Sequence, residues 1–230
     1  MTRIKILSLV IFGGFLAACS NSNVVSRSAP FEPLSLEKSL TGTPEEGVFS
    51  TDTTFAQSLL NVQVEEISVL VPQTLKVSEA NSYLPKGDIV WRGEPHGDRY
   101  AQVKAIFEAA LLRGTEQIIG ERPVHLEIEV QRFHGLSEKA RYTVGGVHNI
   151  TFLLTLRDPV TGVALAPPRQ VQADLEAFGG KKAIKADSVG QTQKVRITDH
   201  LAHVIHQELT QVDGFQNPRL GLFQAMNKRL

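Results

Sequence analysis

The stretch PVHLEIEVQRF, residues 123–133, alternates apolar and polar side chains along its length. Successive side chains of a β-strand point to opposite faces, so such a segment has one apolar and one polar side. The apolar positions are Val124, Leu126, Ile128 and Val130, and the polar positions are His125, Glu127, Glu129 and Gln131. This pattern predicts a strand with one solvated face, as is typical of an antiparallel sheet that helices cover on one side.

Three other segments have strand-like patterns. Residues 61–72 alternate but change phase at Glu65-Glu66, which predicts a strand with a β-bulge. Residues 148–157 alternate and then end in a turn, and residues 169–178 alternate again. Pro167-Pro168 directly precede the last of these, so we expect that end of the strand to lie at an edge or a bulge.

Two segments have the 3.6-residue period of amphipathic helices. In residues 97–114, Asp98 is placed to cap the first turn and Gly114 to supply a left-handed stop. The second segment is residues 192–210. The order β-α-β-β-β-α predicts an α+β fold, with an antiparallel sheet of about four strands and two helices packed on one face.

The charge balance argues against one class of partner. Lys and Arg together number 24, and Asp and Glu together also number 24, in a chain of 230 residues. Without a net positive field there is little to recruit a polyanion, so we expect no nucleic-acid partner.

The N-terminal residues have the pattern of an export signal. Arg3 and Lys5 precede thirteen uncharged residues, 6–18, which are too few to span a bilayer as a helix. The sequence LAAC, residues 16–19, resembles the lipobox of bacterial lipoproteins. That resemblance implies cleavage before Cys19 and lipid attached to Cys19 as a membrane anchor. The alternative is a secretory signal with an incidental cysteine.

The resemblance also implies a location. Ser20 after the cysteine resembles lipoproteins that are sorted to the outer membrane, with the domain facing the periplasm. We therefore expect a signal peptide at 1–18, a lipidated cysteine and flexible tether at 19–58, an α+β domain at 59–212 and a C-terminal tail at 213–230. The tail is consistent with a short amphipathic helix or with irregular docking. Since Cys19 is the only cysteine, no intramolecular disulfide can form.

Two groups of polar residues are candidates for metal binding or catalysis. His200, His203 and His206 recur every three residues, so on a helix the outer two lie about 120° apart and cannot easily share an ion. A solvated polar face is the favoured interpretation. The second group is Glu94, His96 and Asp98, for which turn formation and helix capping are the simpler interpretation.

Two loops are further candidates. Gly145-Gly146 precede a predicted strand without the spacing of a phosphate-binding loop, which favours a hairpin turn. Residues 179–185, GGKKAIK, place three lysines in a predicted loop, which is either solvated or contacts an anionic partner such as lipid. We see no G-x-S-x-G nucleophile motif, and we predict no catalytic residue, no cofactor and no metal.

Several stretches resemble an uncharacterised lipoprotein family, a domain of unknown function. They include GDIVWRGEPHGDRYAQV, EKARYTVGGVHNITFLLTLRDP and TQKVRITDHL. The architecture is also similar to that of transport-auxiliary and envelope-assembly lipoproteins. These resemblances imply a non-catalytic accessory subunit that docks on an envelope protein machine. The alternative is a carrier of lipid or glycolipid with a cavity between sheet and helices, and a hydrolase centred near His96 is the least favoured.

Overall fold

The computed structural model describes residues 60–217. The expected signal peptide, Cys19, the tether and residues 218–230 of the expected tail lie outside the described residues. Within residues 60–217, no helix is both long enough and apolar enough to cross a membrane.

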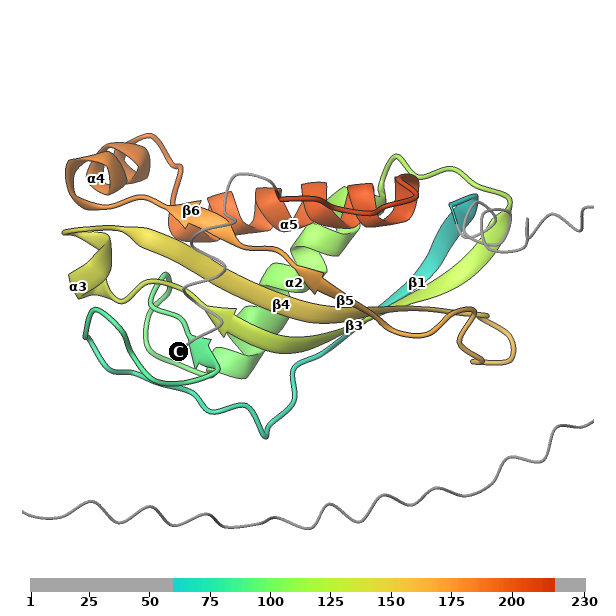
Figure 1. Ribbon diagram of the computed structural model, residues 1–230, viewed down its shortest axis with the longest axis horizontal. Coiled ribbons are helices and arrows are strands. Elements are labelled where there is room, and N and C mark those ends of the chain that lie inside the picture. The colour runs from blue at the N-terminus through green and yellow to red at the C-terminus, as the bar shows by residue number, and fades with distance from the viewer. Residues whose placement is uncertain (1–59, 218–230) are drawn as a thin grey trace, which may run out of the picture. The chain divides into compact units, whose positions relative to one another are not determined.

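The described residues form one mixed sheet with helices, which confirms the α+β class (Figure 1). At its centre are two long antiparallel strands, β3 (Arg122–His134) and β4 (Gly146–Arg157). β1 (Val62–Leu70) and the short β2 (Ile89–Val90) pair one after the other with the outer edge of β3. β5 (Arg169–Gln172) and β6 (Leu175–Ala177) pair in the same way with β4.

The sheet differs from expectation in strand direction. β1 and β2 both run parallel to β3, whereas an antiparallel sheet was predicted. The reason is the helix that connects β2 to β3, because a crossover helix returns the chain to the end of the sheet from which it left. The predicted bulge in β1 is confirmed, since the register with β3 shifts between Val64 and Glu66.

The predicted strand at 169–178 is interrupted and forms β5 and β6. The break lies at Ala173-Asp174, where the Asp174 side chain turns back toward β4. Its Oδ1 accepts hydrogen bonds from the Ile150 backbone N at 3.0 Å and from Asn149 Nδ2 at 2.7 Å. The Asp174 carboxylate therefore accepts the hydrogen bond from Ile150 that a backbone carbonyl would accept in a continuous strand.

Two long helices, α2 (Arg99–Thr115) and α5 (Gln193–Thr210), pack against each other on one face of the sheet. The predicted cap is confirmed, since Asp98 Oδ1 accepts a hydrogen bond from the Ala101 backbone N at 3.1 Å. The predicted stop at Gly114 is wrong, because the helix continues through it. A Cβ on Gly114 would lie 2.6 Å from the carbonyl oxygen of Ala202, so this glycine permits the close crossing of α2 and α5.

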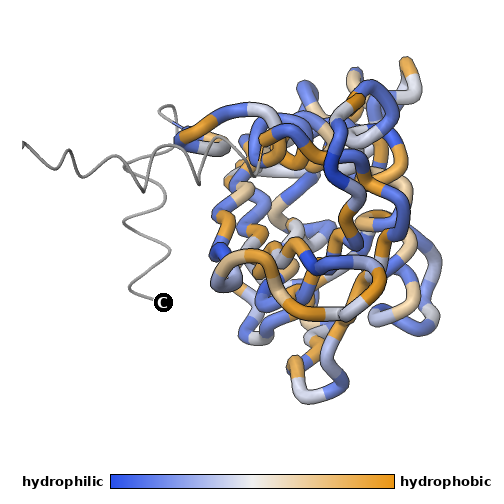
Figure 2. Tube along the Cα trace, turned by 90° about the vertical axis from the view of Figure 1, so that its right-hand side faces the viewer, coloured by the Kyte–Doolittle hydropathy of each residue, from blue (hydrophilic) through white to orange (hydrophobic). Residues whose placement is uncertain are grey.

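The core lies between the sheet and these two helices. The apolar side chains of β3 are fully buried there, as their alternation predicts, and Figure 2 shows hydrophobic and hydrophilic residues alternating along the strands. Aromatic rings fill the space in edge-on contacts, with ring centres 5.4 Å apart for Phe107 and Phe152 and 5.5 Å apart for Trp91 and Phe133. Two short helices, α3 (Glu138–Arg141) and α4 (Gly180–Ser188), complete the described elements.

Candidate binding pocket

A pocket of about 650 Å³ opens on the polar side of the sheet, where residues 76–88 pass the end of β3 and the start of β4. Phe133 and Ile150 are buried under the helices, and the residues beside them, His134 and Asn149, point the other way into the pocket. A volume of this size is in the range that holds a small ligand or a few side chains of a partner.

The loop that forms one wall is closed at its base. The Lys76 backbone N donates to Asp88 Oδ2 at 2.9 Å, and the Asp88 backbone N donates to the Lys76 carbonyl at 2.8 Å. Gly87 is needed where the two sides of the base meet, because a Cβ there would lie 2.9 Å from Cβ of Ser78. The base of the loop is thus held by two hydrogen bonds between residues 76 and 88 and by the close approach of Gly87 to Ser78.

The far part of the loop is fastened to the sheet and to α3. His134 Nε2 lies 2.8 Å from the Pro85 carbonyl, which can only accept, so this nitrogen carries the proton. Burial lowers the pKa of His134, which favours the neutral ring. Ser137 caps α3 and donates its hydroxyl to the Ser82 carbonyl at 2.5 Å. The wall is therefore built into the fold before any ligand arrives.

The pocket carries an excess of positive charge. Lys76, Lys86 and Arg132 line it, and within residues 60–217 no carboxylate lies in ion-pair range of any of them. The one carboxylate among the described lining residues is Asp88, which is engaged at the base of the loop. At the rim, Leu84 is 69% exposed. The site thus combines three cations with exposed apolar surface.

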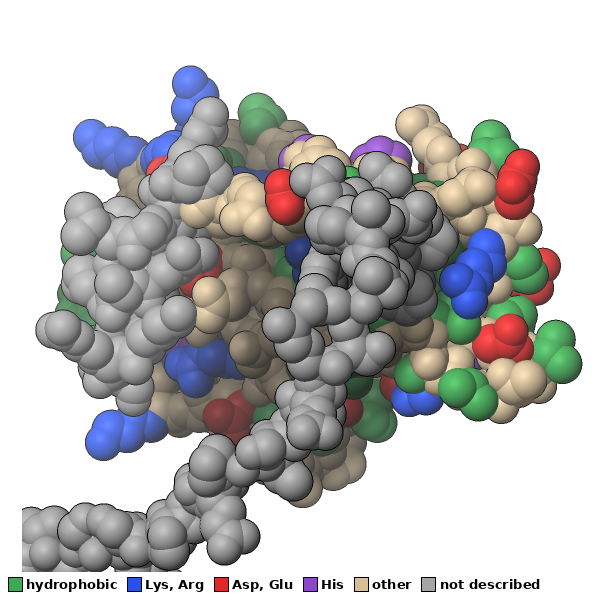
Figure 3. All heavy atoms as spheres, turned by 45° about the vertical axis from the view of Figure 1, so that its right-hand side comes forward, with side chains coloured by type: hydrophobic (Ala, Val, Ile, Leu, Met, Phe, Trp, Pro, Cys, Tyr) green, Lys and Arg blue, Asp and Glu red, His purple; other side chains and the backbone are tan. Residues whose placement is uncertain are grey.

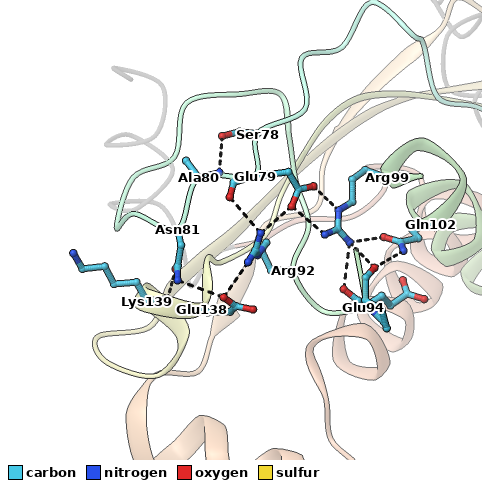
Figure 4. Close-up of polar contacts among 11 residues, drawn as sticks. Ser78, Glu79, Ala80, Asn81, Arg92, Glu94, Arg99, Gln102, Glu138 and Lys139 are labelled. Carbon is cyan, nitrogen blue, oxygen red and sulfur yellow. Dashed lines mark hydrogen bonds and ion pairs between the residues drawn. The ribbon is translucent and has the colours of Figure 1, made fainter. Parts of the chain in front are cut away.

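A neighbouring cluster of charges behaves differently, since its members are paired with each other (Figure 4). The guanidinium of Arg99 is buried and contacts both carboxylate oxygens of Glu79, at 2.7 and 3.1 Å. Arg92 bridges Glu79 and Glu138, at 2.8 and 3.0 Å. These arginines hold residue 79, at the start of the pocket loop, against α2 and α3, so their role is structural.

Within the candidate residues 94–98, Glu94 and Asp98 have structural partners. Asp98 caps α2, and His96 is exposed without a described hydrogen bond. Glu94 accepts from Trp91 Nε1 at 2.8 Å and from Lys194 Nζ at 2.6 Å, which joins the loop to α5. The interpretation of these residues as turn and cap is therefore the one that fits.

The three histidines of α5 have partners other than a shared ion. His200 and His203 both lie against the ring of Phe215, with centres 5.5 and 6.5 Å apart, and His206 Nδ1 lies 3.3 Å from the Gly114 carbonyl. Among residues 60–217, no three His, Cys, Asp or Glu side chains are grouped so as to hold a metal ion. Of the three, His203 is exposed, and burial lowers the pKa of His200 to about 4.

Two loop predictions need correction. The connection from β3 to β4 contains helix α3 instead of a simple hairpin turn, and Gly145, with φ of 73°, ends it by donating its N–H to the Ala140 carbonyl. The lysine-rich segment was predicted to be a loop, but residues Gly180–Ser188 form helix α4. Lys182 pairs there with Glu176 at 2.8 Å.

The pocket is not predicted by any pattern in the sequence. Its cations come from two segments about fifty residues apart, and no motif links Lys76 and Lys86 to Arg132. The one local signal was the turn Pro85-Lys86-Gly87-Asp88, which indicates a tight loop but not the strand against which that loop packs. On the face that Figure 3 presents, acidic and basic side chains are interspersed. The equal totals of basic and acidic residues in the sequence gave no indication of a cationic site either.

Comparison with known proteins gives a family and no activity. No curated protein matches the chain. Among solved structures, the chain is similar to a "putative lipoprotein" from Caulobacter crescentus CB15, at 10% identity and a TM-score of 0.33, over 71% of this chain and 98% of that one. A likeness at that score carries no argument about fold or function. A family model, however, matches residues 62–225, which include every described strand and helix. The chain therefore belongs to the Family of unknown function (DUF6778).

Proposed function

We propose that the protein is a non-catalytic, lipid-anchored subunit of the bacterial envelope, and that the pocket docks an acidic segment of a partner protein. The observation that carries the proposal is the set of three unpaired cations, Lys76, Lys86 and Arg132, in one preformed pocket. In the neighbouring cluster, by contrast, Arg92 and Arg99 are both paired with carboxylates.

The chemistry of the pocket suits a carboxylate-bearing segment. A ligand of opposite charge gains most where cations outnumber carboxylates in the site and the backbone that carries them is already in place, because little reorganisation is then needed. The exposed Leu84 and the half-exposed Tyr83 supply apolar contact beside Lys86. Lys139 Nζ lies 4.7 Å from the centre of the Tyr83 ring and adds one more positive charge near the rim.

The anchor and the location rest on the sequence. Cleavage before Cys19 and lipidation of its sulfur follow from the likeness of residues 16–19 to a lipobox. More than one acyl chain is needed for stable attachment, and lipoproteins of this kind carry several. We place the domain on the periplasmic side of the outer membrane, where a tether from residue 19 to residue 58 gives it freedom to reach a partner.

A lipid or glycolipid carrier is the second candidate. Its expected cavity between sheet and helices is not favoured, because aromatic rings fill that interface. The pocket on the opposite face of the sheet is the better candidate for a lipid site. Leu84 and Lys86 place an apolar and a cationic group side by side there, as an acyl chain and its headgroup require.

Site-specific photo-cross-linking tests the proposal in the native envelope. A photoreactive amino acid at Leu84 should form an adduct with one protein, identified by mass spectrometry, whereas the same group at the distant Ile119, which is 90% exposed, should not. The double variant Lys86→Gln/Arg132→Gln should abolish the adduct. The matched variant Lys104→Gln/Arg113→Gln, which removes two cations from α2, should retain it.

Two results would overturn docking. One is a protein adduct at Leu84 that persists in the pocket double variant. The other is an adduct with lipid alone, lost in the same variant, which would establish the carrier instead.

A further inference from the structure

The short helix α4 presents a regular exposed face that the pocket does not involve. Positions one helical turn apart share a face, and four such positions of α4 are exposed. They are Lys181, Ile184, Lys185 and Ser188. Ala183, on the opposite side, is buried and fixes the orientation of the helix.

More apolar side chains are exposed at the same end of the sheet. Ile184 and Val189 are 55% and 68% exposed, and Tyr142 and Val144, just after α3, are 52% and 74% exposed. We call residues 142–144 together with 180–189 the α4 tip. Figure 1 shows α3 and α4 at one end of the sheet, with α4 projecting from it.

The α4 tip is held together as one unit. A Cβ on Gly180 would lie 3.0 Å from the Thr143 carbonyl oxygen, and one on Gly179 would lie 2.5 Å from the carbonyl carbon of Val144. Arg141 forms an ion pair with Asp187 on the side of α4 that faces α3. The two exposed surfaces are thus fixed relative to each other.

The outward charge of the α4 tip is positive. Its carboxylate, Asp187, is engaged by Arg141, and Lys182 is paired with Glu176. Within residues 60–217, no carboxylate lies in ion-pair range of Lys181 or Lys185. Two free ammonium groups therefore flank the exposed side chain of Ile184.

We infer that the α4 tip binds the surface of an anionic phospholipid bilayer. Lysines flanking aliphatic side chains suit such a surface, since the charges meet headgroup phosphates while the apolar groups enter the boundary with the acyl chains. A tyrosine at the edge is typical of the same interface. The large apolar side chains of the α4 tip are all exposed, and this is the arrangement that contact with the boundary of a bilayer requires.

This inference stands apart from the pocket and from the lipid anchor. It gives the domain a second contact with the membrane and sets which end of the sheet faces it. The lysines are expected to act through charge, so the contact should weaken at high salt, where screening shortens the range of surface charges.

Vesicle co-sedimentation tests the inference with residues 19–230 carrying Cys19→Ser, so that no acyl chain contributes. We expect this chain to bind phosphatidylglycerol vesicles and to bind phosphatidylcholine vesicles far less. Each basic side chain near an anionic surface contributes about fivefold, so Lys181→Gln/Lys185→Gln should lower binding about thirtyfold. Lys104→Gln/Arg113→Gln removes the same charge from α2 and should leave binding within about twofold.

A second pair of variants tests the apolar part. Ile184→Ser should weaken binding to phosphatidylglycerol vesicles. Ile119→Ser should not, because Ile119 is 90% exposed but lies outside the α4 tip. Absence of binding by the parent chain, with its circular dichroism spectrum intact, would overturn the inference. So would binding that the lysine variant leaves unchanged. If Lys86→Gln/Arg132→Gln alone abolished vesicle binding, the pocket and not the α4 tip would be the lipid site.

Discussion

Arg99 and Glu79 form a bidentate ion pair beside the candidate pocket, with N–O distances of 2.7 and 3.1 Å. The side chain of Arg99 is 3% exposed and that of Glu79 is 35% exposed. The remaining N–H groups of the arginine donate to the carbonyls of Glu94 and Pro95 and to the side chain of Gln102. One guanidinium thus joins the pocket loop, the loop before α2 and α2 itself.

Removing this guanidinium should destabilise the protein strongly. We expect Arg99→Gln to lower the free energy of unfolding by about 3 kcal/mol, because it leaves buried acceptors without donors. Urea unfolding followed by circular dichroism measures the change. Arg157→Gln, which breaks a partly exposed pair with Glu127, is the control and should cost far less, because solvent screens that pair. Equal effects of the two variants would contradict a structural role for the Arg99 cluster.

The helix crossing should be sensitive to a single methyl group. Gly114→Ala places a Cβ 2.6 Å from the Ala202 carbonyl oxygen, so α2 and α5 must move apart. Overpacking of this kind costs about 2 kcal/mol, which a thermal melt would detect. Gly97→Ala is a matched control, since its Cβ would approach only the flexible end of Gln102, at 3.3 Å. A Gly114→Ala protein as stable as the parent would show that the two helices do not cross so closely.

Stability should fall as the solution is acidified below neutrality. Burial lowers the pKa of His148 to about 3 and that of His200 to about 4, against 6.5 for an ordinary histidine. The unfolded chain therefore takes up protons first, so this stability is complete above pH 6.5 and is lost as the pH falls toward the folded values. At pH 5 each histidine should cost about 2 kcal/mol. Urea unfolding at pH 7 and pH 5 measures the difference.

One variant isolates the contribution of His148. Its ring is fully buried, and neither nitrogen has a hydrogen-bond partner among the described residues. We expect His148→Phe to reduce the loss between pH 7 and pH 5 by about 2 kcal/mol, because the aromatic ring stays while the titrating group goes. An unchanged loss would mean that His148 takes up a proton as readily in the folded protein as in the unfolded chain.

The lipid anchor is tested by one substitution. Cys19→Ser in the full-length chain should abolish incorporation of labelled palmitate, since no thiol remains to accept lipid. The protein should then leave the membrane fraction on washing with high salt, which removes charge-based contacts. Labelling that persists in the variant would rule out Cys19 as the lipidated residue.

The parts of the fold that were predictable are those that local patterns determine. The alternation in β3 determines which side chains are buried, and Asp98 caps α2 because a capping carboxylate needs only the next three residues. The predicted helix stop at Gly114 was wrong because a glycine near a helix end is compatible either with a stop or with a close helix crossing. Only the position of Ala202, almost ninety residues later, distinguishes the two.

The candidate pocket could not be predicted from local sequence patterns. Lys76 and Lys86 reach the pocket because the Asp88 side chain closes the loop between them, and Arg132 arrives from β3. The parallel pairing of β1 with β3 has the same origin, since strand direction depends on what the intervening helix packs against. A single sequence shows neither relationship.

The pairing of β1 with β3 also has a consequence for biogenesis. Val62 pairs with Arg122, so β1 must await a partner that is synthesised sixty residues later. Long-range pairings of this kind form slowly, because the chain must close a large loop first. A polypeptide that emerges from the ribosome N-terminus first therefore keeps β1 unfolded until β3 has been made. Such a delay would suit the export that the N-terminal residues predict, if the chain crosses the membrane before it folds.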